Sequence, residues 1–123
     1  GIKCRIITSE MEVINLSELK IKTLEEWKQE LLVLKTRLQE EIDNALDTAK
    51  KLEIKAYTAD QAKGRLGARN EVFVEAFVTP LFSELEIAEE KFKEIREENF
   101  KKIKQLDALI HQIEFDLEFH KVQ

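Results

Sequence analysis

The sequence predicts an elongated, all-α protein, built either as an antiparallel three-helix bundle or as a helical hairpin with coiled-coil-like packing. The 123 residues include only 3 Gly and 1 Pro, too few for the many tight turns of a β-sandwich or barrel. Hydrophobic residues make up 43% and charged residues 37%, which is typical of long helices with one apolar and one charged face. Apolar residues also recur three and four positions apart, which is the heptad pattern of packed helices.

Residues 1–22 are expected to form a short N-terminal arm in front of a helical domain over residues 23–123. Ile2, Cys4 and Ile6 alternate with charged residues, which is the period-two pattern of a strand. Ser9-x-x-Glu12 also has the form of a helix capping box, so a helical arm is the alternative. We favour a β-like arm that packs on the helices or on a partner chain, because an isolated hairpin is marginally stable in water.

The first long helix is expected over residues 24–53. Thr23 and Glu26 form a capping box at its start, in which each side chain satisfies a backbone N–H group. Five apolar residues then follow at spacings of three and four and occupy the a and d positions of heptads. This first seam consists of Leu24, Trp27, Leu31, Leu34 and Leu38.

Two further helices are expected over residues 58–78 and 80–121. A second capping box begins at Thr58, and Pro80 suits a first helical position, where its missing N–H costs nothing. The alternative is a single kinked helix, because no Gly or polar loop separates the two segments. The stretch before Pro80 is apolar nearly all round, so we expect it at the centre of the core.

In the third helix, apolar residues follow a seven-residue repeat except around Asn99, where one interval of eleven residues occurs. A buried polar residue in a seam can fix the register of two helices or the number of chains in an assembly. We therefore single out Asn99 as a register residue, with a solvent-facing asparagine as the alternative.

The end of the third helix carries a second apolar face, which would be uncovered if this helix extends beyond the first. Exposed apolar patches mark interaction sites. The residues expected to contact a partner or a second copy are Phe115, Phe119, Val122, Trp27, Leu31, Leu34 and Asn99.

The net charge of −5 argues against general nucleic-acid binding, which depends on neutralising phosphates. The segment from Lys63 to Arg69 is nevertheless basic and contains two glycines. Lys63, Arg65 and Arg69 are therefore candidates for contact with an anion or a nucleic acid. We favour a simpler interpretation, in which Gly64 and Gly67 allow a helix break or close packing.

No residue is singled out as catalytic, and neither a metal, a cofactor nor a small-molecule substrate is expected. His111 shares a helix face with Asp107 and Glu114, but the paired Glu-x-x-His pattern of di-metal bundles is lacking, so we expect a solvated polar face. With a single cysteine, no signal peptide and no long apolar run, we expect a cytoplasmic, intracellular chain without a membrane span.

These observations predict a non-enzymatic helical protein–protein interaction module. Such a module would act as a spacer, scaffold, adaptor or assembly subunit, and the apolar heptad faces suggest a homo-oligomer. The alternative function is that of an accessory subunit that contacts nucleic acid through the basic segment between Lys63 and Arg69.

Overall fold

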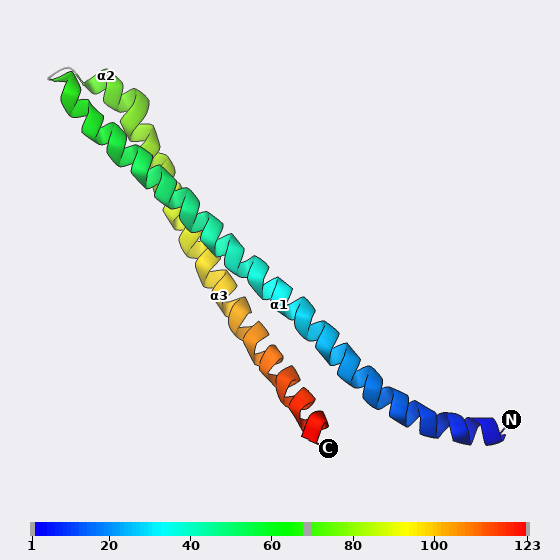
Figure 1. Ribbon diagram of the computed structural model, residues 1–123. Helices are drawn as coiled ribbons and strands as arrows, with labels where there is room; N and C mark the ends of the chain where they lie inside the picture. Colours follow the sequence, from blue (N-terminus) through cyan, green and yellow to red (C-terminus); the bar gives the residue numbers. More distant parts are fainter. Residues whose placement is uncertain (1, 68–69, 123) are drawn as a thin grey trace. The chain divides into compact units, whose positions relative to one another are not determined.

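A computed structural model shows a helical protein in which two long helices pack against each other (Figure 1). The structure describes the backbone of residues 2–67 and 70–122, and the side chains of residues 17–67 and 70–120. Within these ranges no residue belongs to a strand. The all-α prediction is confirmed, and a helical hairpin fits the observed arrangement. The elements are α1 (Ile2–Lys63), η1 (Gly64–Leu66), α2 (Glu71–Phe73), η2 (Val74–Val78) and α3 (Thr79–Val122).

Helix α1 is longer than the sequence suggests. Residues 2–22 are helical, so the strand-like arm is not found there, while Gly1 lies outside the described residues. The expected break before Thr58 is also wrong, because α1 continues to Lys63. No Gly or Pro lies between these ends, and extending an existing helix adds one hydrogen bond for each residue fixed. The two capping-box threonines therefore lie inside the helix.

The second half of the chain is helical without interruption from Glu71 to Val122. The alternative of one helix through Pro80 is therefore the correct one, and the separate helix predicted over residues 58–78 is wrong. Just before Pro80 the helix widens into the π-helical turn η2, in which the Thr79 N–H donates to the Val74 carbonyl. The proline ring would clash with the carbonyl of Ala76 in a regular α-helix, and a wider turn relieves that clash.

Gly67 provides the break after α1 and η1. Its φ of 72° and ψ of −148° lie in a region that is essentially open to glycine alone. A Cβ atom added to either Gly64 or Gly67 would meet no atom within 4 Å, so close packing does not explain these glycines. Of the two expected roles, the helix break is the one that the structure shows at Gly67.

The contacts between residues divide the chain into two compact units, each containing part of both long helices. The terminal unit comprises residues 1–36 and 103–123, and the turn unit comprises residues 37–102. In the terminal unit, four buried residues form the core: Leu31, Ile110, Ile113 and Leu117. Partly buried side chains pack around them: Ile21, Leu24, Leu32, Leu106 and Leu109.

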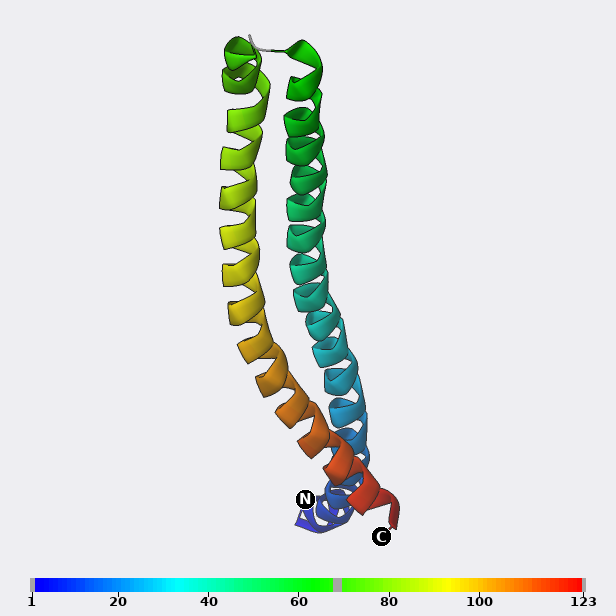
Figure 2. The same ribbon diagram turned by 90° about the vertical axis from the view of Figure 1, so that its left-hand side faces the viewer.

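The turn unit contains an antiparallel pair of helical segments (Figure 2). An aromatic contact joins Tyr57 to Phe82, with ring centroids 5.3 Å apart, and a hydrogen bond joins Asn99 to Leu38. The order of these two contacts along the chain sets the antiparallel direction. The buried apolar residues are Leu38, Ile42, Ala49, Ala56, Val78 and Leu85.

Candidate interaction surface

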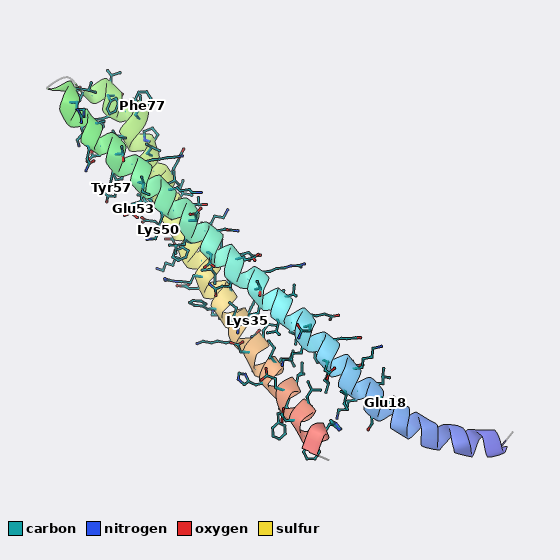
Figure 3. The ribbon with its side chains drawn as sticks, viewed as in Figure 1. Glu18, Lys35, Lys50, Glu53, Tyr57 and Phe77 are labelled. Carbon is teal, nitrogen blue, oxygen red and sulfur yellow. The ribbon has the colours of Figure 1, made fainter. Side chains whose placement is uncertain are left out.

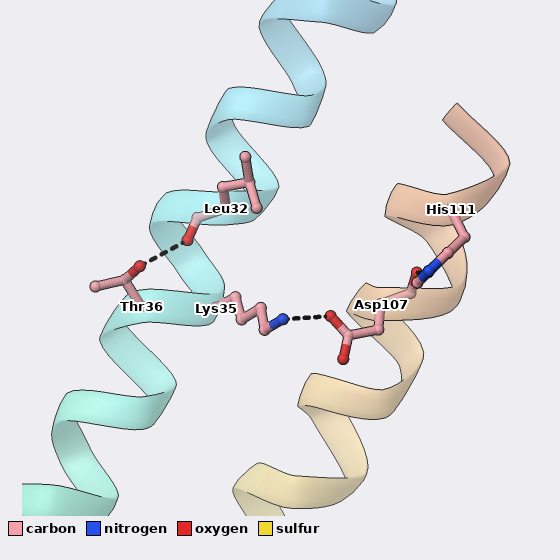
Figure 4. A network of polar contacts seen from close by, with 5 residues as sticks. All are labelled: Leu32, Lys35, Thr36, Asp107 and His111. Atoms are coloured by element: carbon pink, nitrogen blue, oxygen red, sulfur yellow. Dashed lines mark hydrogen bonds and ion pairs between the residues drawn. The ribbon is translucent and has the colours of Figure 1, made fainter. Parts of the chain in front are cut away.

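One edge of the helix pair in the terminal unit is closed by two ion pairs. Lys28 Nζ lies 3.3 Å from Glu114 Oε1, and Lys35 Nζ lies 2.6 Å from Asp107 Oδ1 (Figure 4). The two lysines are seven residues apart on α1, and the two acids are seven apart on α3. The pairs therefore repeat every two helical turns along the same edge.

The other edge of the same pair remains open. Trp27 and Leu34 directly precede the two paired lysines, so they point about 100° away from them around α1. Trp27 is 41% exposed and Leu34 is 44% exposed, whereas Leu31 between them is 7% exposed. We call Trp27 and Leu34 the open edge. The predicted first seam is thus only partly covered by α3.

The side chains of His111 and Asp107 make separate polar contacts. His111 Nδ1 lies 2.7 Å from the backbone carbonyl of Asp107, while the Asp107 carboxylate pairs with Lys35 (Figure 4). Among the described residues, no group of three or more His, Cys, Asp or Glu side chains could hold a metal ion.

The turn unit has a groove of about 340 Å³ between its two helical segments. Ala45 on α1 and Ala88 on α3 leave this space because their side chains end at Cβ. Ile95 adds apolar surface, and the remaining lining is polar. The full lining consists of Glu41, Asn44, Ala45, Thr48, Ala88, Lys91 and Ile95.

Asn99 is buried beside this groove, with only 3% of its surface exposed, which excludes the solvent-facing alternative. Its Nδ2 atom donates to the Leu38 carbonyl and to Glu41 Oε2, both at 2.9 Å. Both acceptors are on α1 of the same chain. These bonds therefore favour one sliding position of α3 along α1 within the turn unit, because another register would leave a buried amide unpaired.

The aromatic residues predicted to contact a partner are on the surface. Phe115 is 67% exposed and Phe119 is 52% exposed, while the side chain of Val122 lies outside the described residues. By helical periodicity Phe115 points away from the core residues Ile113 and Leu117. Together, Phe115 and Phe119 form an aromatic patch on α3, separate from the open edge.

The basic segment is only partly described. Lys63 Nζ pairs with Asp60 Oδ1 at 2.7 Å, and Arg65 is exposed in η1. Arg69 lies outside the described residues. The structure thus places one of the three predicted cations next to a carboxylate, and contact with an anion stays a prediction.

The apolar stretch before Pro80 is more exposed than expected. Val72 is 81% exposed, whereas Val78 is buried. Phe77, labelled in Figure 3, is 58% exposed. The π-helical turn explains part of this difference, because its extra residue changes which side chains face α1. Sequence spacing carries no signal for such a turn, and the expectation that this whole stretch forms the core centre is wrong.

The sequence analysis also missed the groove, because alanines in a helix give no functional signal by themselves.

Comparison with models of known families, with curated proteins and with solved structures found no match to this chain. Within the described residues, no helix is long and apolar enough to cross a membrane.

Proposed function

We propose that this chain is a non-enzymatic helical interaction module that associates with itself and serves as a spacer, scaffold, adaptor or assembly subunit. The observation that supports this most is the open edge of the terminal unit. Trp27 and Leu34 are large apolar residues in a heptad seam, yet more than two fifths of each remains exposed. Single exposed apolar residues are common, but two exposed apolar residues that lie seven positions apart on the same side of a helix form a stripe.

Burial of this stripe would stabilise an assembly. Full burial of a leucine side chain contributes roughly 1.5–3 kcal/mol, and aromatic side chains bury still larger areas. Covering the exposed parts of Trp27 and Leu34 is therefore worth on the order of 1 kcal/mol or more for each residue. Helices from a second chain would complete a bundle with coiled-coil-like packing around the seam.

Sedimentation equilibrium at concentrations from about 1 to about 100 μM tests this proposal directly, since this range covers moderate affinities. We expect the mass to rise with concentration, and the emission of Trp27, the single tryptophan, to shift to the blue. Leu34→Lys should abolish the rise because it places a charge in the interface. Val33→Lys is the matched control, because Val33 is 53% exposed and adjacent but points to a different side of α1. A monomer at every concentration contradicts the proposal.

The aromatic patch of Phe115 and Phe119 stays a predicted contact site for a protein partner or another copy. Alanine at both positions removes exposed apolar surface without opening a core cavity, so stability should change by less than about 0.5 kcal/mol. If the patch is functional, the double variant assembles or binds more weakly while its urea midpoint is unchanged. Equal binding by both proteins would remove this patch from the functional surface.

A further inference from the structure

We propose that the partner of the open edge is a second copy of this chain, and that this copy receives Leu34 in its alanine-lined groove. In this arrangement the α1 helices of the two copies run antiparallel. The inference rests on the proposed function and deepens it, because it names both the partner and the receiving surface.

The first support is a match of shape. Leu34 protrudes from the terminal unit with 44% of its surface exposed. The groove of the turn unit is hollow because Ala45 and Ala88 stand where larger seam residues would fill the space. A leucine inserted among small residues of a facing helix pair is the knob-into-hole contact by which helices pack. One unit of the chain thus carries the protrusion and the other carries the hollow.

The second support is the charge on both surfaces. Glu30 and Arg37 are exposed and lie about one turn before and after Leu34 on α1, separated by seven residues or about 10.5 Å. Glu41 and Lys91 line the groove and are exposed. Glu41 lies beside Asn99, eight residues or about 12 Å along α3 from Lys91. The two pairs of opposite charges therefore have similar spacing.

The order of these charges selects one orientation. If α1 of one copy runs antiparallel to α1 of the other, Glu30 meets Lys91 and Arg37 meets Glu41 across the interface. The reverse orientation places Glu30 against Glu41 and Arg37 against Lys91, which brings like charges together and disfavours binding. Two-fold symmetry then repeats each attractive contact, as is usual for homodimers.

Disulfide cross-linking tests the location of the contact. In a Cys4→Ser background, the double variant Leu34→Cys/Ala45→Cys should give a covalent dimer on mild oxidation. A bond within one chain is excluded, because positions 34 and 45 of α1 are about 16 Å apart and disulfides need Cα atoms within about 7 Å. Val33→Cys/Ala45→Cys is the control, and we expect at least roughly fivefold less dimer from it because position 33 faces elsewhere.

Charge reversal tests the orientation. Lys91→Glu should weaken the dimer by roughly fivefold or more, because the change acts at two symmetric contacts. The double variant Glu30→Lys/Lys91→Glu should restore most of the affinity. Lys93→Glu is the matched control, since Lys93 is exposed, does not line the groove and alters net charge equally. Circular dichroism checks that each variant is folded.

The outcomes separate this inference from the proposed function. A cross-linked dimer together with rescue by the double charge variant supports the antiparallel second copy. A wild-type oligomer that neither cross-links at these positions nor responds to Lys91→Glu overturns the inference and leaves self-association standing. A wild-type monomer at every concentration overturns both.

Discussion

The terminal unit and the turn unit are built from the same two helices, yet they differ in the size of the side chains between those helices. In the terminal unit the buried residues are branched aliphatics such as Leu31 and Ile113, and large apolar residues reach the surface at one edge. In the turn unit Ala49 and Ala56 are buried, Ala45 and Ala88 line a groove, and a buried amide bonds across the helix pair.

This difference shows how one simple architecture can present two kinds of surface. A pair of helices covers only one side of each helix, so the residues next to the seam decide the shape of the remaining edge. Large residues make that edge protrude, and alanines leave it hollow. The two edges therefore differ in shape, and the proposed dimer makes use of that difference.

The largest effect is expected from Ile113→Ala, which tests how much the stability of the terminal unit depends on its buried core. Ile113 is 2% exposed, so its truncation leaves a cavity and should lower the free energy of unfolding by about 2–4 kcal/mol. Urea denaturation at the lowest measurable protein concentration determines this loss. Leu34→Ala should cost much less under those dilute conditions, and an equal cost would mean that the open edge is covered within the single chain.

Asn99→Ala tests whether the turn unit depends on its buried amide as the terminal unit depends on aliphatic packing. Removal of the amide breaks both bonds to α1 and should lower the free energy of unfolding by about 1–3 kcal/mol. Glu41→Gln is the matched control because it keeps a carbonyl acceptor at that position. Urea unfolding of the two variants should show the larger loss for Asn99→Ala, and the opposite order would contradict a positioning role for Asn99.

Gly67→Ala tests the turn that connects the two helices of the turn unit. The backbone of Gly67 lies where a Cβ atom causes strain, so the variant should be less stable by about 1–2 kcal/mol. Gly64→Ala offers the contrast, since its Cβ would meet nothing and the variant should gain about 0.4–1 kcal/mol. Thermal unfolding of both proteins measures these shifts, and a stabilised Gly67→Ala variant would contradict the assigned turn geometry.

The smallest effect is expected at the ionic edge of the terminal unit. Both partners of the Lys35–Asp107 pair are about two fifths exposed, so Lys35→Met should change stability by less than about 1 kcal/mol. The difference from wild type should shrink further in 1 M salt, where the Debye length is about 3 Å. Urea unfolding at low and high salt checks this, and a large salt-independent loss would show that this edge is more buried than its exposure indicates.

The sequence predicted the helical class, and it placed the end of the last helix within one residue of Val122. The helix starts that the sequence predicted at Thr23 and Thr58 were wrong. A capping box stabilises a helix start only where the preceding residues are not themselves helical. The π-helical turn before Pro80 was also missed, since its wider hydrogen bond leaves no mark on apolar spacing.

The sequence also predicted only part of the candidate surface. Trp27, Leu34 and Asn99 were identified from the heptad pattern, but the pattern assigns all seam positions the same importance. It therefore could not show that Leu31 is buried while Trp27 and Leu34 are exposed, because coverage depends on where the second helix lies. The groove forms where the small side chains of Ala45 and Ala88 come together, and these two residues are far apart in the sequence.

The turn at Gly67 has a consequence for the order in which the chain folds. Tyr57 and Phe82, which meet close to this turn, are 25 residues apart in sequence, whereas Lys28 and Glu114 are 86 apart. Closing the longer loop costs about 1 kcal/mol more entropy if the shorter contact has not formed first. We therefore expect folding to start at the turn and to proceed outward, so that mutations near Gly67 slow folding while mutations near Lys28 mainly speed unfolding.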